Sequence, residues 1–283
     1  MTLDSQHKTE STRTTTFSGM AKEGSRLVVS NTGRGIMERA EIAGRALVLF
    51  YQAVGQMRSV SRSMPMLIKQ IEMIGFGSLL VLALISGLTG MIMAVQMGVT
   101  LQDYGAMDTL GGLIAVTFCR ELGPIWAAVI ILARVGSAMA AELGTMAVNE
   151  EIDALRSMSI DPVRFLVMPR ILALIITMPL LAAVADFVGM MGGAMVAKAT
   201  FGLTMDSFFE SAKGMLEFGD FFSGIIKSMF FACLIGTIAC DQGLHTSDGA
   251  EGVGKATTRT VVLCVIFVLL MDLFLTSFVQ RLF

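Results

Sequence analysis

Long apolar stretches separated by short polar ones dominate the sequence. Between Met73 and Gln102 there is no Asp, Glu, Lys or Arg, and this run alone exceeds the roughly 20 residues that a helix needs to cross a bilayer. Four more apolar stretches, each interrupted by a charged residue, follow at 109–146, 171–197, 221–240 and 260–280. The pattern predicts an all-α integral membrane domain over 65–283 with five transmembrane helices. An odd number of spans places the two ends of the chain on opposite sides of the membrane.

A second periodicity precedes the first span. Apolar residues recur there at alternating steps of four and three, which is the stripe of one helix face. They are Ile36, Ala40, Ala43, Leu47, Phe50, Val54 and Met57. A charged amphipathic helix beside a span usually lies in the headgroup layer. We therefore expect an interfacial amphipathic helix over 35–64, with Pro65 marking its end; packing against the helix of a partner is the alternative interpretation.

Composition and charge narrow the class further. Of the 283 residues, 54% are hydrophobic and 16% are charged, whereas soluble domains carry about 25% charged residues. The net charge of −2 argues against a nucleic-acid partner, because such partners bind mainly to basic surfaces. The N-terminal tail over 1–34 is polar and mixed in charge, without an apolar core. It is expected to be disordered, and no signal peptide is expected.

The distribution of Lys and Arg predicts the orientation. Segments 1–72, 147–170 and 241–259 hold 15 of the 21 Lys and Arg residues, whereas 103–108, 198–220 and 281–283 hold three. When only positions near the span ends are counted, the comparison is eight against three. Because basic residues concentrate on the cytoplasmic side, we expect the N-terminus inside the cell and the C-terminus outside.

The second apolar stretch carries a charged pair, Arg120 and Glu121, shortly before Pro124. As one straight helix, this stretch would run about 57 Å, well beyond a hydrocarbon core of about 30 Å. Pro124 has no N–H for the carbonyl of Arg120 and should bend the helix at the pair. An ionised pair at this depth usually faces a cavity or a partner. Either it meets an anionic headgroup, or it forms a structural ion pair with a neighbouring helix.

Further charges lie in other spans, at Asp186, Lys227 and Asp272. One acid packed against Lys227 would neutralise both groups, so interhelical ion pairing is the first interpretation and a proton relay the alternative. Small residues at a spacing of four indicate closely packed helices; they are Gly136, Ala140 and Gly144 in the second span, and Gly189 and Gly193 in the third.

The stretch "GAEGVGKAT" at 249–257 resembles a phosphate-binding loop, but Ala256 stands where a magnesium-binding hydroxyl is needed. A polar linker precedes it instead of a buried strand, and an apolar span follows. We therefore expect a flexible cytoplasmic turn and no hydrolysis of ATP by this chain. The four cysteines, which contain no C-x-x-C pair, are expected to be buried apolar residues, without a metal or cofactor; they are Cys119, Cys233, Cys240 and Cys264.

The polar segment "AVNEEIDALRSMSIDPVR" joins the second and third spans. Asn149 can cap a helix whose first turn is acidic, and Pro162 discourages its continuation. A cytoplasmic helix over about 149–160 is predicted. It is either an ordinary connection or a docking element for a soluble motor protein, with the candidate contact residues Glu150, Glu151, Asp153, Leu155 and Arg156.

Several of these segments together resemble the permease family of the MlaE/YrbE type. They are "RELGP" (120–124), "ARVGSAMAAELGTM" (133–146), "EEIDAL" (150–155), "DP" (161–162), "PR" (169–170) and "KATTRTVV" (255–262). The resemblance implies the non-catalytic, homodimeric permease of an ABC system that moves phospholipids between the inner and outer membranes of bacteria. It also implies a soluble ATPase subunit docked at 149–160, a periplasmic MCE-domain protein and, in many such systems, a STAS-domain protein. The chain would then lie in the inner membrane with its C-terminus in the periplasm.

In this family the lipid pocket lies between the first, second and last spans at the dimer axis. By position, the resemblance assigns to it Met93, Thr100, Leu101, Tyr104, Arg120, Glu121, Lys255 and Arg259. Two other functions stay open. An intramembrane lipid-modifying enzyme would need a carboxylate mechanism, because His7 and His245 lie outside the spans. A proton-coupled carrier of small solutes would be expected to have matching interrupted helices, which the sequence does not indicate.

Overall fold

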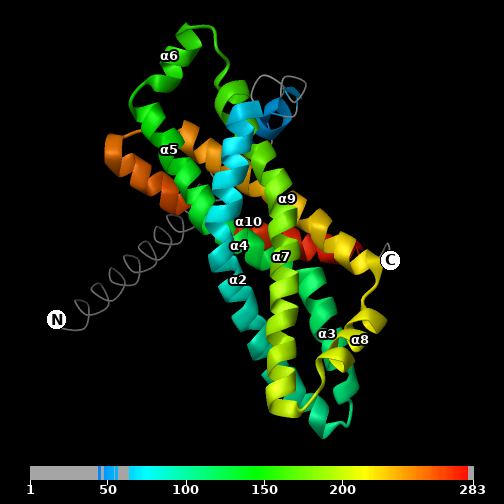
Figure 1. Ribbon diagram of the computed structural model, residues 1–283. Helices are drawn as coiled ribbons and strands as arrows, with labels where there is room; N and C mark the ends of the chain where they lie inside the picture. Colours follow the sequence, from blue (N-terminus) through cyan, green and yellow to red (C-terminus); the bar gives the residue numbers. More distant parts are fainter. Residues whose placement is uncertain (1–43, 46–47, 54, 57–63, 280–283) are drawn as a thin grey trace, which may run out of the picture. The chain divides into compact units, whose positions relative to one another are not determined.

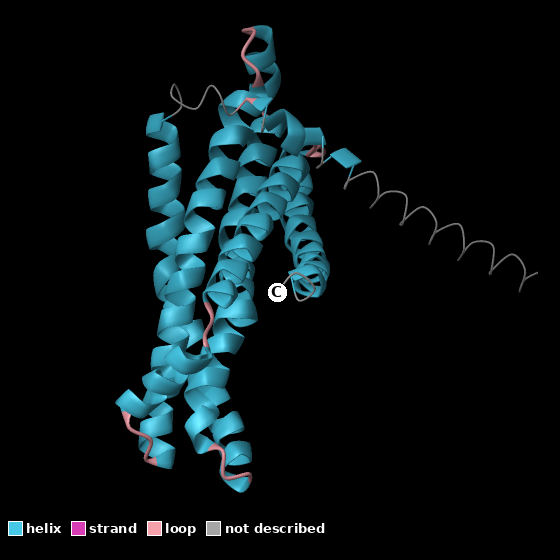
Figure 2. Ribbon diagram, turned by 90° about the vertical axis from the view of Figure 1, so that its right-hand side faces the viewer, coloured by secondary structure: helices cyan, strands magenta, loops and turns pink. Residues whose placement is uncertain are grey.

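The computed structural model describes residues 44–45, 48–53, 55–56 and 64–279. Within these residues it contains helices and loops and no strand (Figures 1 and 2), which confirms the predicted fold class. The chain divides into two units, 1–45 and 46–283, and the helical bundle belongs to the second. The tail 1–34 and most of the expected interfacial helix lie outside the described residues. Of that expected helix, residues 44–45, 48–53 and 55 are described as helical, and Leu49 and Ala53 are buried.

Among the described residues, five helical stretches are long and apolar enough to cross a membrane. The first is α2, Met64–Asp103, and it begins earlier than the apolar pattern suggested. Pro65 lies in its first turn, where the missing N–H of proline costs no helical hydrogen bond. The proline therefore lies at the opening of the first span, and the predicted end of the interfacial helix before it falls outside the described residues.

The second span, Met107–Val148, is helical throughout but changes its winding twice. It consists of η2 (Met107–Thr109), α3 (Leu110–Thr117), η3 (Phe118–Leu122), α4 (Gly123–Ile131), η4 (Leu132–Gly136) and α5 (Ser137–Val148). The segments η3 and η4 are π-helical. The irregularity expected from Pro124 is therefore a widened turn immediately before it, because the carbonyl of Arg120 has no α-helical partner.

The remaining helices complete the bundle. They are α6 (Glu151–Ser157), the π-helical η5 (Val163–Val167), α7 (Met168–Phe201), α8 (Met205–Met215), α9 (Phe218–Leu244) and α10 (Gly249–Val279). The last helix begins eleven residues before the predicted span at 260–280. The expected flexible turn at 249–257 is therefore wrong: Asp248 and Gly249 turn the chain with positive φ, and the residues after them are already helical.

Close packing of α2 against α7 organises the bundle, and the two helices run side by side in Figure 1. A Cβ at Gly90 would overlap the carbonyl of Gly189, and one at Gly192 would overlap that of Gly87. Small residues thus let the two backbones approach closely, as predicted for the third span. Helices α9 and α10 cross this pair obliquely (Figure 1).

The two ends of the bundle carry different short helices (Figure 1). At one end, α8 packs on α3 through the buried Phe208 and is capped by the Thr204 hydroxyl, which accepts from the Ser207 N–H at 3.2 Å. The sequence did not indicate this helix. At the other end lies α6, which is shorter than the predicted 149–160.

The predicted capping of α6 by Asn149 is wrong. Glu150 occupies the cap position with a left-handed φ of 59° and without a side-chain cap. The Asn149 amide instead lies 3.4 Å from the Glu151 carboxylate. At the other end of α6, Ser159 has a φ of 61°. Because a left-handed residue cannot continue an α-helix, these two positions limit α6 to two turns.

Candidate functional site

The polar centre of the bundle includes the backbone carbonyl of Arg120, whose α-helical donor is missing because Pro124 has no N–H. Lys227 of α9 donates to this Arg120 oxygen at 3.0 Å. The ammonium thus replaces the N–H that a residue other than proline would supply. Its contact stabilises the π-helical turn η3 and attaches the second span to α9.

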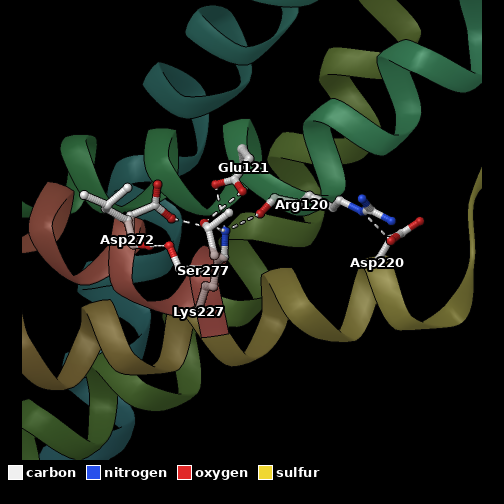
Figure 3. A network of polar contacts seen from close by, with 8 residues as sticks. Arg120, Glu121, Asp220, Lys227, Asp272 and Ser277 are labelled. Carbon is white, nitrogen blue, oxygen red and sulfur yellow. Dashed lines mark hydrogen bonds and ion pairs between the residues drawn. The ribbon is translucent and has the colours of Figure 1, made fainter. Parts of the chain in front are cut away.

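Lys227 is also the centre of an ion network between three spans (Figure 3). Its ammonium lies 2.7 Å from Glu121 Oε2, 2.7 Å from Thr276 Oγ1 and 3.2 Å from Asp272 Oδ1. The Thr276 hydroxyl in turn donates to Glu121 Oε1 at 3.0 Å. The Lys227 side chain is only 2% exposed. The predicted interhelical pairing is therefore confirmed for Lys227 and Asp272.

Arg120 points away from Lys227 and pairs with a residue that the sequence pattern did not single out (Figure 3). Its Nε lies 2.5 Å from Asp220 Oδ1 at the start of α9. Asp220 also accepts from the Glu217 N–H at 3.1 Å, and the two residues form a capping box. The predicted boundary of the fourth span at 221 placed Asp220 in a loop. The capping pattern of Glu217 and Asp220, three residues apart, was the signal that could have moved this boundary.

Arg120 is the most exposed side chain among these ion pairs. The side chains of Lys227 and Asp220 are 2% and 6% exposed, whereas that of Arg120 is 47% exposed. The terminal nitrogens of Arg120 make no hydrogen bond with the residues that the structure describes. Arg120 can therefore accept an anionic ligand while its Nε stays bonded to Asp220. Among the described residues, no group of His, Cys, Asp and Glu is arranged to hold a metal ion.

Asp186 of α7 does not join the network. It is buried, and it makes no hydrogen bond or ion pair with the part of the chain that the structure describes. Its Oδ1 lies so close to Gly123 that a Cβ there would overlap it. Of the two acids considered as partners for Lys227, the structure thus selects Asp272.

The other residues assigned to a lipid pocket lie at two places. Met93, Thr100, Leu101 and Tyr104 belong to the end of α2 and the turn after it, near the α8 end of the bundle (Figure 1). Tyr104 is exposed, and Leu101 packs on the core around Phe208. Lys255 and Arg259 lie in the first turns of α10, where Lys255 pairs with Glu251 at 2.8 Å. Of the eight assigned residues, Arg120 and Glu121 belong to the network around Lys227.

The candidate docking residues form the exposed surface of α6. Glu150, Glu151 and Asp153 are exposed, whereas Leu155 is partly buried. Arg156 lies 3.0 Å from Asp153 in an exposed pair within the helix. The buried Ile152 attaches α6 to the rest of the bundle. Gln56, which lies before α2, donates to Asp161 at 3.2 Å and contacts the same connection.

The stretch 249–257 has neither the strand-to-helix element order nor the loop geometry of a phosphate-binding loop. It forms the first turns of α10, and the element before it is the helix α9. A phosphate-binding loop instead joins a strand to a helix and uses its backbone N–H groups to hold phosphate. The resemblance is therefore confined to the sequence.

Known proteins give independent information on the chain. The sequence model of the family described as Permease MlaE matches residues 67–278. A probable ABC transporter permease protein of Synechocystis is 36% identical over 74% of this chain and 80% of its own length. The intermembrane phospholipid transport system permease protein MlaE of Haemophilus influenzae is 34% identical over 88% and 96%. The chloroplastic protein TRIGALACTOSYLDIACYLGLYCEROL 1 of Arabidopsis thaliana is 36% identical over 75% and 60%.

Proposed function

Because the chain belongs to the MlaE permease family, we propose that it is the permease subunit of an ABC-type transporter that moves phospholipids between the inner and outer membranes. It works as a homodimer in a bacterial inner membrane, with its N-terminus in the cytoplasm and its C-terminus in the periplasm. A separate ATPase subunit supplies the energy. A periplasmic MCE-domain protein, with a STAS-domain protein in some systems, completes the assembly.

Two observations support this assignment over a self-sufficient enzyme. The Haemophilus influenzae relative is named as a phospholipid transport permease, and it aligns with 88% of the chain. The stretch 249–257 is helical and follows a helix, which does not fit a phosphate-binding loop and supports a separate subunit as the source of energy. The exposed acidic residues of α6 provide a surface to which such a subunit can dock.

The half-exposed guanidinium of Arg120 is the observation that carries the choice of substrate. Its Nε is bonded to Asp220, while its terminal nitrogens have no partner among the described residues. A phosphate group matches the planar fork of a guanidinium and can bind it through two hydrogen bonds. The network lies within the second, fourth and fifth apolar spans, so a lipid with its chains in the bilayer would place its phosphate at Arg120.

Replacing Arg120 tests this proposal. We expect Arg120→Ala to lower the amount of phospholipid that co-purifies with the assembled complex by about tenfold or more, because a charge-assisted contact contributes about 1.5–3 kcal/mol. Lipid is measured by mass spectrometry per mole of permease. Asp220→Asn should have the opposite effect or none, since it releases Arg120 from its carboxylate.

Arg134 provides the matched control. It lies on the same span, is exposed, and donates to the Ser78 hydroxyl at 2.9 Å outside the network. Arg134→Ala should leave the bound lipid near the native amount. If the Arg120→Ala complex retained as much lipid as the native complex, Arg120 would have a structural role only, and the main support for the proposed headgroup contact would be lost.

A further inference from the structure

A second ion pair, of which only the arginine is buried, lies at the α6 end of the bundle, away from the network at Lys227. Arg170, the third residue of α7, places its Nη2 2.9 Å from Glu142 Oε1 on α5. The arginine side chain is 3% exposed, whereas that of Glu142 is 56% exposed. A buried guanidinium is costly unless it is paired, so this contact is an important part of the local structure.

The pair closes the connection that contains α6. Going along the chain, α5 ends at Val148, α6 covers Glu151–Ser157, and η5 leads into α7. Glu142 lies before this connection and Arg170 lies after it. Their contact therefore joins the two ends of the connection directly, so that any displacement of α6 must act on α5 and α7 together.

Helix α9 completes the arrangement. Glu142, Arg170 and Asp241 all lie close enough to the Cys240 thiol to interact with it electrostatically. A Cβ at Gly243 would overlap Leu143 of α5, and one at Gly236 would press on Ile171 of α7. Helix α9 therefore packs closely on both α5 and α7, the two helices that the Glu142–Arg170 pair joins.

The guanidinium also has hydrogen-bonding capacity in reserve. Its Nε and Nη1 are buried and make no hydrogen bond within the described residues. Buried donors of this kind are rare in folded proteins, because each costs free energy. An arginine with donors in reserve can exchange acceptors when the helices around it shift, without losing its contact with Glu142.

We propose that Arg170 is a positioning residue that transmits movement of α6 to α7 and α9. The inference rests on the proposed function, in which an ATPase subunit acts on α6. The Glu142–Arg170 pair holds the base of the α6 connection rigid. ATP-driven displacement of α6 then moves the spans instead of only bending the connection.

The test uses the complete transporter in lipid vesicles and measures phospholipid moved per ATP hydrolysed. Arg170→Gln is the main variant, because it leaves behind only the exposed carboxylate of Glu142, which water can solvate. We expect normal assembly with the ATPase and a fall in this ratio of about fivefold or more, the usual size of a coupling between sites. Arg170→Lys, which keeps the charge beside Glu142, should recover part of the ratio.

A control and a substitute variant separate coupling from folding. Arg164→Gln removes another arginine of the same connection, one that has no ion pair among the described residues, and should leave the ratio unchanged. If Arg170→Gln fails to assemble, Glu142→Gln replaces it, because it breaks the same pair from the exposed side. A native ratio in whichever of these two variants assembles overturns the inference.

The proposed docking at α6 is tested separately by Glu151→Lys. Loss of ATPase binding in this variant, together with a native ratio for Arg170→Gln, would refute the role of Arg170 and leave the proposed function intact. Unchanged ATPase binding would refute the docking site itself, whatever the Arg170 variants show.

Discussion

A single ammonium group joins three membrane-spanning segments of this protein. Lys227 of α9 contacts Glu121 and the Arg120 carbonyl in the second span, and Asp272 and Thr276 in α10. An ammonium has three protons for these four acceptors, so at least one contact is electrostatic without a full hydrogen bond. In hydrocarbon, removal of this group leaves two carboxylates without a counter-charge.

Lys227→Met should therefore destabilise the protein strongly. We expect a loss of about 3–5 kcal/mol, the cost of breaking a buried ion pair from one side. The measurement is the thermal unfolding of purified protein in detergent, followed by the loss of monodisperse material. The triple variant Lys227→Met, Glu121→Gln and Asp272→Asn should recover much of this stability, since no unpaired charge remains. If the single variant were as stable as the native protein, the network would not hold the spans together.

At the scale of elements, the closest helix contact depends on the absence of side chains. Helices α2 and α7 approach so closely that a Cβ on Gly90 would overlap the carbonyl of Gly189, and a Cβ on Gly189 would overlap the Phe118 ring of the second span. In lipid no hydrophobic effect draws helices together, so dispersion between closely packed backbones stabilises such crossings. Small residues also lose little side-chain entropy on packing, which keeps the cost of association low. Their geometry therefore depends on glycine at particular positions.

Gly90→Ala is the corresponding prediction. The added methyl group would meet the backbone of α7, which cannot give way as a flexible side chain could. We expect a loss of about 1–3 kcal/mol, typical of overpacking, seen as a lower unfolding temperature in detergent. Gly254→Ala is the matched control on α10, because a Cβ at Gly254 meets nothing within 4 Å. It should be neutral or slightly stabilising through its higher helix propensity. Equal effects at both positions would contradict the close-packing argument.

At the scale of the whole molecule, five spans separate two chemically different ends. The α6 end carries the connection between the second and third spans, and the opposite end carries α8 (Figure 1). The excess of Lys and Arg on the segments at the α6 end predicts, by the positive-inside rule, that this end faces the cytoplasm. The proposed docking of an ATPase at α6 requires the same orientation.

Labelling from one side of the membrane tests this topology. Met158, at the end of α6, is 68% exposed, and Lys213 of α8 is also exposed. A membrane-impermeant maleimide should label Met158→Cys only in inside-out vesicles and Lys213→Cys only in right-side-out vesicles. Of the native cysteines, Cys119, Cys240 and Cys264 are buried as predicted, whereas Cys233 is only partly buried, so labelling of the native protein is subtracted as background. The opposite pattern would reverse the orientation and exclude α6 as a cytoplasmic docking element.

The sequence by itself determined the features that depend on local chemistry. Uncharged runs indicated five spans because the hydrocarbon core sets a minimum helix length, irrespective of how the helices pack. Pro124 indicated an irregular turn at Arg120 because the missing N–H is a property of one residue. The small residues of the third span indicated close packing because the absence of a large side chain lets another backbone approach.

The tertiary structure decided what depends on residues distant in the chain. Lys227 could pair with either acid by composition, and only the packing of α10 on α9 selected Asp272 and left Asp186 alone. Asp220 became the partner of Arg120 because α9 begins before its apolar run. The helix α10 likewise begins at Gly249, before its apolar run, so hydropathy did not indicate its first turns. Hydropathy marks where a helix enters hydrocarbon, whereas its first turn and its ion-pair partners are set by capping and by neighbouring helices.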